Sequence, residues 1–125
     1  MIVLDTNVVM EILEKRARSQ AVGQILSRHK SHINAVTTLT LSNVFYLVER
    51  HKKETVIAAR LLQTYKIIGV TPEDASWAFT HYKGKDFEDA LQVAAALREE
   101  CTAFLTLDAS LAKKYGKFLN VELVS

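Results

Sequence analysis

Short apolar runs alternate along this chain with segments of helical periodicity, and this alternation limits the folds that the chain can adopt. The apolar runs cover residues 1–4, 32–36, 66–70, 103–106 and 120–124. Strands that alternate with helices are typical of a parallel sheet with helices on both faces. We therefore predict an α/β fold, a three-layer α/β/α sandwich with a central parallel sheet of about five strands, in which residues 66–70 form a buried strand.

The segments between these runs have the apolar spacing and the start signals of helices. We predict helices over residues 7–16, 19–28, 38–50, 54–65, 73–82 and 86–100, and a short helical turn over 111–115. Ser19 suits an N-cap, and Pro72 suits a first helical turn after Thr71. Glycine is sparse, Pro72 is the single proline, and no repeat or linker is present. The 125 residues are therefore expected to form one domain, residues 1–125.

Composition excludes several classes of protein. The chain has one cysteine, Cys101, so an internal disulfide is impossible and a reducing compartment is expected. No signal-peptide pattern and no apolar run of about 20 residues is present, so we expect a cytoplasmic protein with no membrane segment. The formal net charge of +2 permits a polyanionic partner without requiring one.

Acidic residues follow two of the expected strands, one directly and one after a single intervening residue, Leu107. Asp5 ends the run 1–4, and Asp108 follows the run 103–106. Parallel strands that are linked by helices end at one edge of the sheet, where ligands bind in open α/β folds. Asp86 and Asp89 open the helix 86–100, which follows another helix, so its start reaches that edge only if the chain returns across it.

These acids have two interpretations. Each one singly is typical of a helix cap, and the pair Asp86 and Asp89 is typical of a helix start. Together at one sheet edge they would repel one another unless a cation neutralised them. Mg²⁺ and similar hard ions prefer carboxylate oxygens, and they activate water and shield phosphodiesters. Lys83 and Lys85, just before Asp86, could attract phosphate to such a site.

Three segments in this order resemble the PIN domain family, in particular its small single-domain prokaryotic members such as the VapC-type toxins of toxin–antitoxin pairs. They are the opening I-V-L-D-T-N, then D-F-E-D-A-L-Q-V-A-A-A at residues 86–96, and F-L-T-L-D at residues 104–108. The resemblance covers nearly the whole chain. It implies a parallel α/β/α sandwich whose acidic pocket binds Mg²⁺ or Mn²⁺ and cleaves RNA.

The resemblance also implies roles for individual residues. Asp5, Asp89 and Asp108 would bind the metal and carry catalysis, and Asp86 would be an auxiliary acid. Around them, the bracing residues would be Thr6, Asn7, Asn43 and Thr106. It further implies an RNA substrate, a homodimer and an antitoxin protein as partner.

One position departs from the family pattern. The family typically has Glu in the segment T-L-x-E, whereas this chain reads Thr40-Leu41-Ser42-Asn43. The Asn43 amide can offer an oxygen to a metal or its water, but it carries no charge.

Three functions therefore remain open. The first is a Mg²⁺- or Mn²⁺-dependent endoribonuclease. The second is a catalytically weakened PIN-like module that binds nucleic acid or another protein. The third, a response-regulator receiver, ranks below both, because Asp5 has no acidic neighbour and no lysine follows the strand 103–106.

Overall fold

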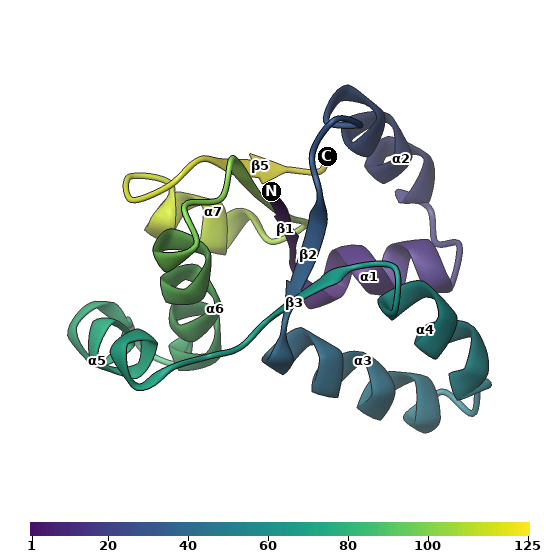
Figure 1. Cartoon of the computed structure of the whole chain (residues 1–125), viewed down its shortest axis with the longest axis horizontal. Coiled ribbons are helices and arrows are strands. Elements are labelled where there is room, and N and C mark those ends of the chain that lie inside the picture. Colours follow the sequence, from purple (N-terminus) through teal and green to yellow (C-terminus); the bar gives the residue numbers. More distant parts are fainter.

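The computed structural model describes all 125 residues and places five short strands in one parallel sheet (Figure 1). The strands are β1 (Ile2–Leu4), β2 (Asn34–Thr37), β3 (Lys66–Ile68), β4 (Ala103–Thr106) and β5 (Val121–Leu123). Their order across the sheet is β3-β2-β1-β4-β5, and every neighbouring pair is parallel. Strand β1 therefore occupies the centre of the sheet.

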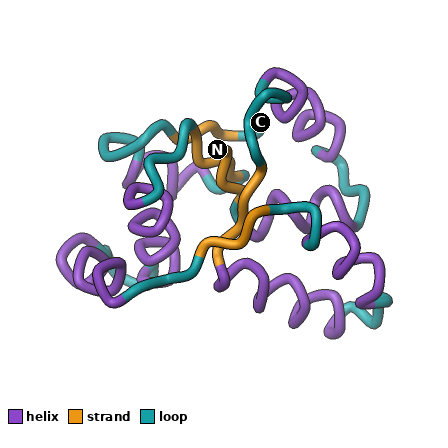
Figure 2. Tube along the Cα trace, viewed as in Figure 1, coloured by secondary structure: helices purple, strands orange, loops and turns teal.

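Seven helices cover the two faces of the sheet, which lies between them in Figures 1 and 2. They are α1 (Thr6–Leu13), α2 (Ser19–Arg28), α3 (Thr38–Arg50), α4 (Thr55–Leu62), α5 (Pro72–His81), α6 (Phe87–Arg98) and α7 (Ala109–Tyr115). Helices α1 to α4 lie on one side of the strands and α5 to α7 on the other. The predicted three-layer α/β/α sandwich is thereby confirmed.

The central strand divides the apolar core into two clusters. Ile2 and Leu4 pack with α1 to α4, whereas Val3, between them, packs with α5 to α7. This division follows from the alternation of side chains along a strand, which sends neighbouring residues to opposite faces. All three side chains are fully buried. The end of β1 is consequently fixed from both sides, and so is the position of the residue that follows it.

Two predictions about individual elements are wrong. Residues 66–70 do not form a buried strand: β3 is an edge strand, and its Lys66 and Ile67 are exposed. Ser19 is not a side-chain N-cap, because Arg18 holds the cap position of α2 and makes no capping hydrogen bond. By contrast, Thr71 and Asp74 form a full capping box at the start of α5. None of the helices combines the length and the apolar character needed to cross a bilayer.

Candidate metal and nuclease site

Asp5 lies at the carboxyl end of β1, and its carboxylate is held by four donors. Oδ1 accepts hydrogen bonds from the Thr6 backbone N–H at 2.8 Å and from Gln92 Nε2 at 3.2 Å. Oδ2 accepts from Thr106 Oγ1 at 2.7 Å and from Asn7 Nδ2 at 3.2 Å. A carboxylate has about four acceptor positions, so the protein fills all of them. Asp5 caps α1 and is also the centre of a larger polar network.

Thr106 and Asn7 connect Asp5 to the end of β4. Strand β4 pairs with β1 so that Leu105 lies opposite Leu4, which places Thr106 beside Asp5. The Thr106 hydroxyl also accepts the Asp108 backbone N–H at 3.0 Å, and Asn7 Oδ1 accepts the Leu107 backbone N–H at 3.1 Å. The ends of the two strands are thus fixed together. Thr6, Asn7 and Thr106 thus all donate hydrogen bonds to the Asp5 carboxylate.

Gln92 of α6 is a further partner of Asp5 that the sequence interpretation did not identify. Its side chain is almost fully buried. The Gln92 Oε1 atom accepts hydrogen bonds from Thr37 Oγ1 at 3.1 Å and Thr40 Oγ1 at 2.7 Å, while Nε2 donates to Asp5. Gln92 lies three residues after Asp89 and hence on the same helical face, which is the signal that could have revealed it.

Asp89 and Asp108 join Asp5 in one acidic pocket of about 430 Å³ at the carboxyl edge of the sheet. Asp108 Oδ1 caps α7 by accepting the backbone N–H groups of Ser110 and Leu111, and Oδ2 has no donor. The Asp89 carboxylate accepts no hydrogen bond. The pocket thus contains carboxylate oxygens that the protein itself leaves unused. Helix α6 thus begins at this edge of the sheet, an arrangement that the sequence allows but does not require.

Burial and mutual repulsion raise the pKa values of two acids in the acidic pocket. Burial raises the pKa of Asp89 to about 7, and the negative charges of Asp5, Asp108, Asp86 and Glu88 add to the rise. Burial also raises the pKa of Asp5, although hydrogen bonds from Thr106, Thr6 and Gln92 oppose it. Carboxylates that resist ionisation in a shared pocket would be relieved by a bound cation.

Asn43 and Glu88 meet at the rim of the acidic pocket. Asn43, from the second turn of α3, donates its Nδ2 hydrogen to Glu88 Oε1 of α6. Both residues line the pocket. A carboxylate therefore lies directly beside the position where the family pattern has Glu. The sequence alone does not identify Glu88 as a pocket residue, because its neighbour in space is 45 residues away in the chain.

Asp86 does not line the acidic pocket. It is buried, Oδ1 accepts the Lys83 backbone N–H at 2.6 Å, and Oδ2 accepts the Tyr115 hydroxyl at 2.7 Å and lies 3.3 Å from Lys114 Nζ. Burial raises the pKa of Asp86, but these partners outweigh it and leave the pKa below its ordinary value. These contacts of Asp86 fix the loop before α6 onto α7, and its role as an auxiliary acid stays a prediction.

Arg16 and Tyr46 also line the acidic pocket, and a search of the sequence for acids does not find them. Arg16 follows α1 and is held by Glu14, with Nε at 3.0 Å from Oε1. Tyr46 of α3 is 60% exposed, and its hydroxyl accepts a hydrogen bond from Arg50. Lys83 and Lys85 lie outside this pocket. The pocket thus combines acids at its base with a guanidinium and an aromatic ring at its rim.

The donor set fits a hard divalent ion that keeps much of its water. As the side chains lie, no three acidic, His or Cys groups converge closely enough to enclose a metal. Mg²⁺ usually binds through one or two carboxylates and retains several waters. Asp89 and the free Oδ2 of Asp108 supply such a pair, while Asp5 adds negative charge at the base. The absence of His and Cys from the pocket excludes a zinc site of the usual type.

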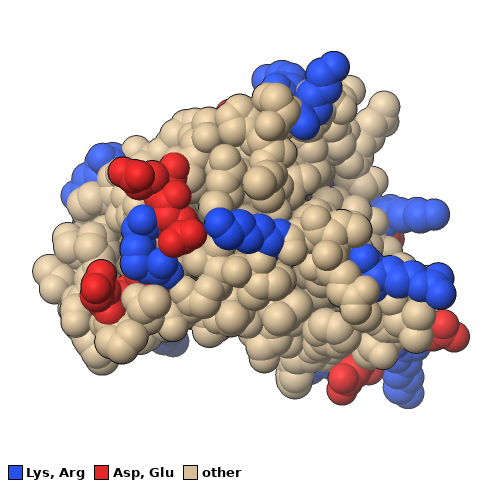
Figure 3. Space-filling model, in the orientation of Figure 1, with Lys and Arg blue, Asp and Glu red and all other residues tan.

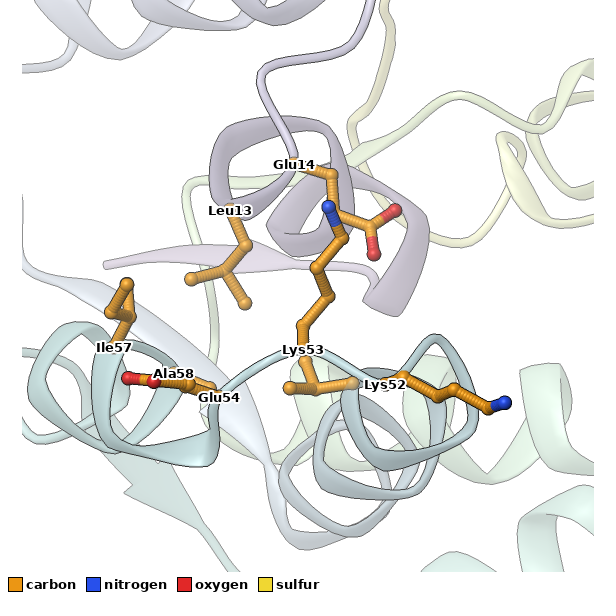
Figure 4. A pocket seen from close by; sticks show the side chains of 8 residues that line it. Leu13, Glu14, Lys52, Lys53, Glu54, Ile57 and Ala58 are labelled. Carbon is orange, nitrogen blue, oxygen red and sulfur yellow. The ribbon is translucent and has the colours of Figure 1, made fainter.

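A second hollow, the apolar groove, lies between α1 and the α3–α4 connection and has a volume of about 390 Å³ (Figure 4). In Figure 4, Leu13 and Ile57 point into it from facing elements, and Lys53 extends toward Glu14. Glu14 is already bound by Arg16 and His51. The lining of the apolar groove is half apolar and half charged, with Lys52, Lys53 and Glu54 contributed by the α3–α4 connection.

The comparisons with known proteins agree with this architecture. A family model described as PIN domain matches residues 1–110. The chain belongs to the PIN domain family. No curated protein sequence matches it significantly.

Solved PIN structures share the fold at low sequence identity. A toxin–antitoxin complex from Klebsiella pneumoniae is 20% identical with a TM-score of 0.78, and the match covers 100% of this chain and 98% of that one. VapBC2 from Rickettsia felis, bound to a promoter DNA fragment, is 19% identical with a TM-score of 0.76 over 100% of both chains. VapC20 from Mycobacterium tuberculosis, a toxin that cleaves the sarcin–ricin loop, is 19% identical with a TM-score of 0.72, covering 90% and 94%.

Proposed function

We propose that this PIN domain protein is a metal-dependent endoribonuclease that hydrolyses phosphodiester bonds in RNA, with Mg²⁺ or Mn²⁺ as cofactor. One observation carries the proposal: Asp5, Asp89 and Asp108, which are far apart in the sequence, line one pocket at the carboxyl edge of the sheet. The raised pKa values of Asp5 and Asp89 indicate how strongly this arrangement disfavours three bare charges. A similar fold belongs to VapC20, whose description names it a toxin that cleaves the sarcin–ricin loop.

Asp89 and Asp108 are the residues that would hold the ion, and Asp5 would complete the negative charge below it. A bound divalent ion supplies a more acidic water and shields the charge of the phosphodiester. The hydrogen bonds of Thr6, Asn7, Gln92 and Thr106 keep the Asp5 carboxylate in one orientation, so little reorganisation accompanies binding. Asp89 releases its proton once neighbouring negative charge is neutralised.

The position of Glu88 bears on whether the protein is an active endoribonuclease or a module with a weakened site. The second candidate, a module without catalysis, is motivated by Asn43, which lacks the charge of the expected Glu. Because Asn43 donates to Glu88, a carboxylate is present at this point of the pocket wall. We assign to Glu88 the charge that position 43 lacks, and on this ground favour the enzyme. Loss of metal binding with retained RNA binding would favour the module instead.

The rim of the acidic pocket suits single-stranded RNA. Exposed aromatic rings stack with bases of any sequence, and Tyr46 presents such a ring. The Arg16 guanidinium can approach a phosphate oxygen, because a single carboxylate neighbour leaves part of its donor fork free. On the face of the molecule that Figure 3 shows, acidic and basic side chains are mixed and scattered, so this face offers no continuous basic surface.

The test is cleavage of a fluorescent single-stranded RNA in the presence of Mn²⁺, with EDTA as the blank. Wild-type protein should cleave, and Asp5→Asn and Asp108→Asn should lose at least about a hundredfold in rate, since removing one preorganised charge commonly costs this much. The matched control is Asp74→Asn, which removes an acid outside the acidic pocket. Equal cleavage by wild type and Asp5→Asn would refute the assignment.

Protein partners form the second part of the proposal. The structures similar to this chain include toxin–antitoxin complexes, so we propose an antitoxin as partner, with the apolar groove as a suitable contact surface. We also propose a homodimer through the exposed Phe79 and Tyr82, which surround Phe87. Light scattering of wild type and Phe79→Ser tests the dimer. A monomeric wild type would contradict it.

A further inference from the structure

Four lysines line a third hollow that the acidic site does not use. Its wall consists of Lys83, Lys113, Lys114, Lys117 and Ser110, encloses about 420 Å³ and contains no apolar side chain. We call it the lysine hollow. Exposed lysines on a helix are usually just solvated, so their number alone indicates nothing.

The lysine hollow is a built feature, because fixed contacts bring its two segments together. Lys83 comes from the loop before α6, whereas the other lysines belong to α7 and the residues after it. Buried Asp86 links the two: it accepts the Lys83 backbone N–H and the hydroxyl of Tyr115, a fully buried residue of α7. The four lysines therefore line one hollow whose two walls are fixed to each other.

The charges in the lysine hollow are mostly uncompensated. Lys114 lies 3.3 Å from Asp86, which neutralises it. Lys83 and Lys113 form no ion pair, and Lys117 has only the Phe118 ring, with Nζ 5.1 Å from its centroid. The lysine hollow thus carries a net charge of about three positive units. A bound anion would reduce the repulsion between these charges, as a bound cation would in the acidic pocket.

The lysine hollow begins where the acidic pocket ends. Ser110 lines the hollow, and its backbone N–H donates to Oδ1 of Asp108 at 2.8 Å. Asp108 in turn lines the acidic pocket. One turn of α7, about 5 Å, separates Ser110 from Lys113 and Lys114. A chain of phosphates that passes Asp108 therefore reaches the lysines with its next units.

We propose that the lysine hollow binds the phosphodiester backbone of single-stranded RNA on one side of the cleaved bond, independently of base sequence. This inference rests on the proposed ribonuclease function. Lysine ammonium groups act as point charges toward phosphate, and the hollow has no aromatic or amide side chain to read a base. Tyr46, across the acidic pocket, contacts the strand on the other side of that bond.

The test is fluorescence anisotropy of a labelled single-stranded RNA in EDTA, where binding is measured without cleavage. The variant is Lys113→Ala/Lys117→Ala, which leaves the Lys114–Asp86 pair intact. The matched control, Lys30→Ala/Lys66→Ala, removes the same charge outside the acidic pocket and the lysine hollow. We expect the variant to weaken binding about tenfold at moderate salt and to lower the slope of log K against log salt by about 1.4. The control should change affinity less than about twofold, because its lysines lie away from the proposed RNA path.

Two results would overturn this inference: unchanged RNA binding in the variant, or equal weakening in the control. Its failure is separable from that of the nuclease proposal. If cleavage depends on Asp5 while the lysine variant binds RNA as the wild type does, only the inference about the lysine hollow is refuted. If the lysine variant selectively loses RNA binding while wild-type protein cleaves no RNA, only the nuclease proposal is refuted.

Discussion

Replacing Asp89 by asparagine should stabilise the protein at neutral and basic pH but not in acid. Burial and neighbouring negative charges raise the pKa of Asp89 from 3.8 to about 7. The folded protein therefore retains a proton that the unfolded chain has already released between these two values. The contribution of Asp89 to stability is therefore fully present only below its ordinary pKa of 3.8, and it is lost as the pH rises through about 7. The amide side chain of the Asp89→Asn variant never ionises, so this variant escapes the loss.

The magnitude follows from the size of the shift. About three pKa units correspond to about 4 kcal/mol if the group were fully buried. Asp89 is partly exposed, and solvent screening reduces the value to about 2 kcal/mol. For a chain of this length, that difference raises the melting temperature by roughly 6–10 °C at about pH 8. Below about pH 3 the two proteins should unfold at nearly the same temperature, because Asp89 is then mostly protonated in both the folded and the unfolded states.

The assay is thermal unfolding followed by Trp77 fluorescence in EDTA, across this pH range. Asp74→Asn serves as a control for which the opposite change in stability is expected. Burial raises the pKa of Asp74, but hydrogen bonds from Arg98 and the Thr71 backbone outweigh it and lower the pKa. Its loss should therefore destabilise the protein at neutral pH, and less in strong acid. Parallel pH curves for wild type and Asp89→Asn would refute the repulsion on which the metal argument rests.

Three further results are expected. Gln92→Leu leaves Asp5, Thr37 and Thr40 without a shared partner in the core, so urea unfolding should show a loss of about 2 kcal/mol. Glu88→Gln should weaken Mn²⁺ binding measured by calorimetry several-fold, because it removes a carboxylate from the pocket wall; unchanged affinity would exclude Glu88. Asn43→Glu should tighten Mn²⁺ binding by a similar factor, and it should raise the cleavage rate if charge at this point limits catalysis.

The sequence predicts the order and type of the elements well, because these depend on local patterns. The apolar run before Asp5 identifies β1, and the capping pattern at Thr71 identifies the start of α5. The error at β3 has a different origin. Whether an apolar run lies at the centre or the edge of a sheet depends on strand order, and no pattern within residues 66–70 contains that information.

The acidic pocket was predictable only in part, for the same reason. Asp5 and Asp108 follow strands of a parallel sheet, so topology alone brings them to one edge. Glu88 gains its significance from Asn43, and Gln92 from Thr37 and Thr40, and these contacts depend on how α3 packs near α6. The lysine hollow likewise requires Asp86 to fix one segment onto another. Side chains that act in pairs across the fold are invisible to reasoning about one segment at a time.

The position of a bound ion tests the central claim most directly. Crystals soaked in Mn²⁺ and measured by anomalous diffraction would locate it without reference to activity. We expect one strong peak in the acidic pocket, in contact with Asp89 and Asp108, which the Asp89→Asn variant loses. An acidic pocket without a peak at a Mn²⁺ concentration that supports RNA cleavage would contradict the assignment of these carboxylates to the metal.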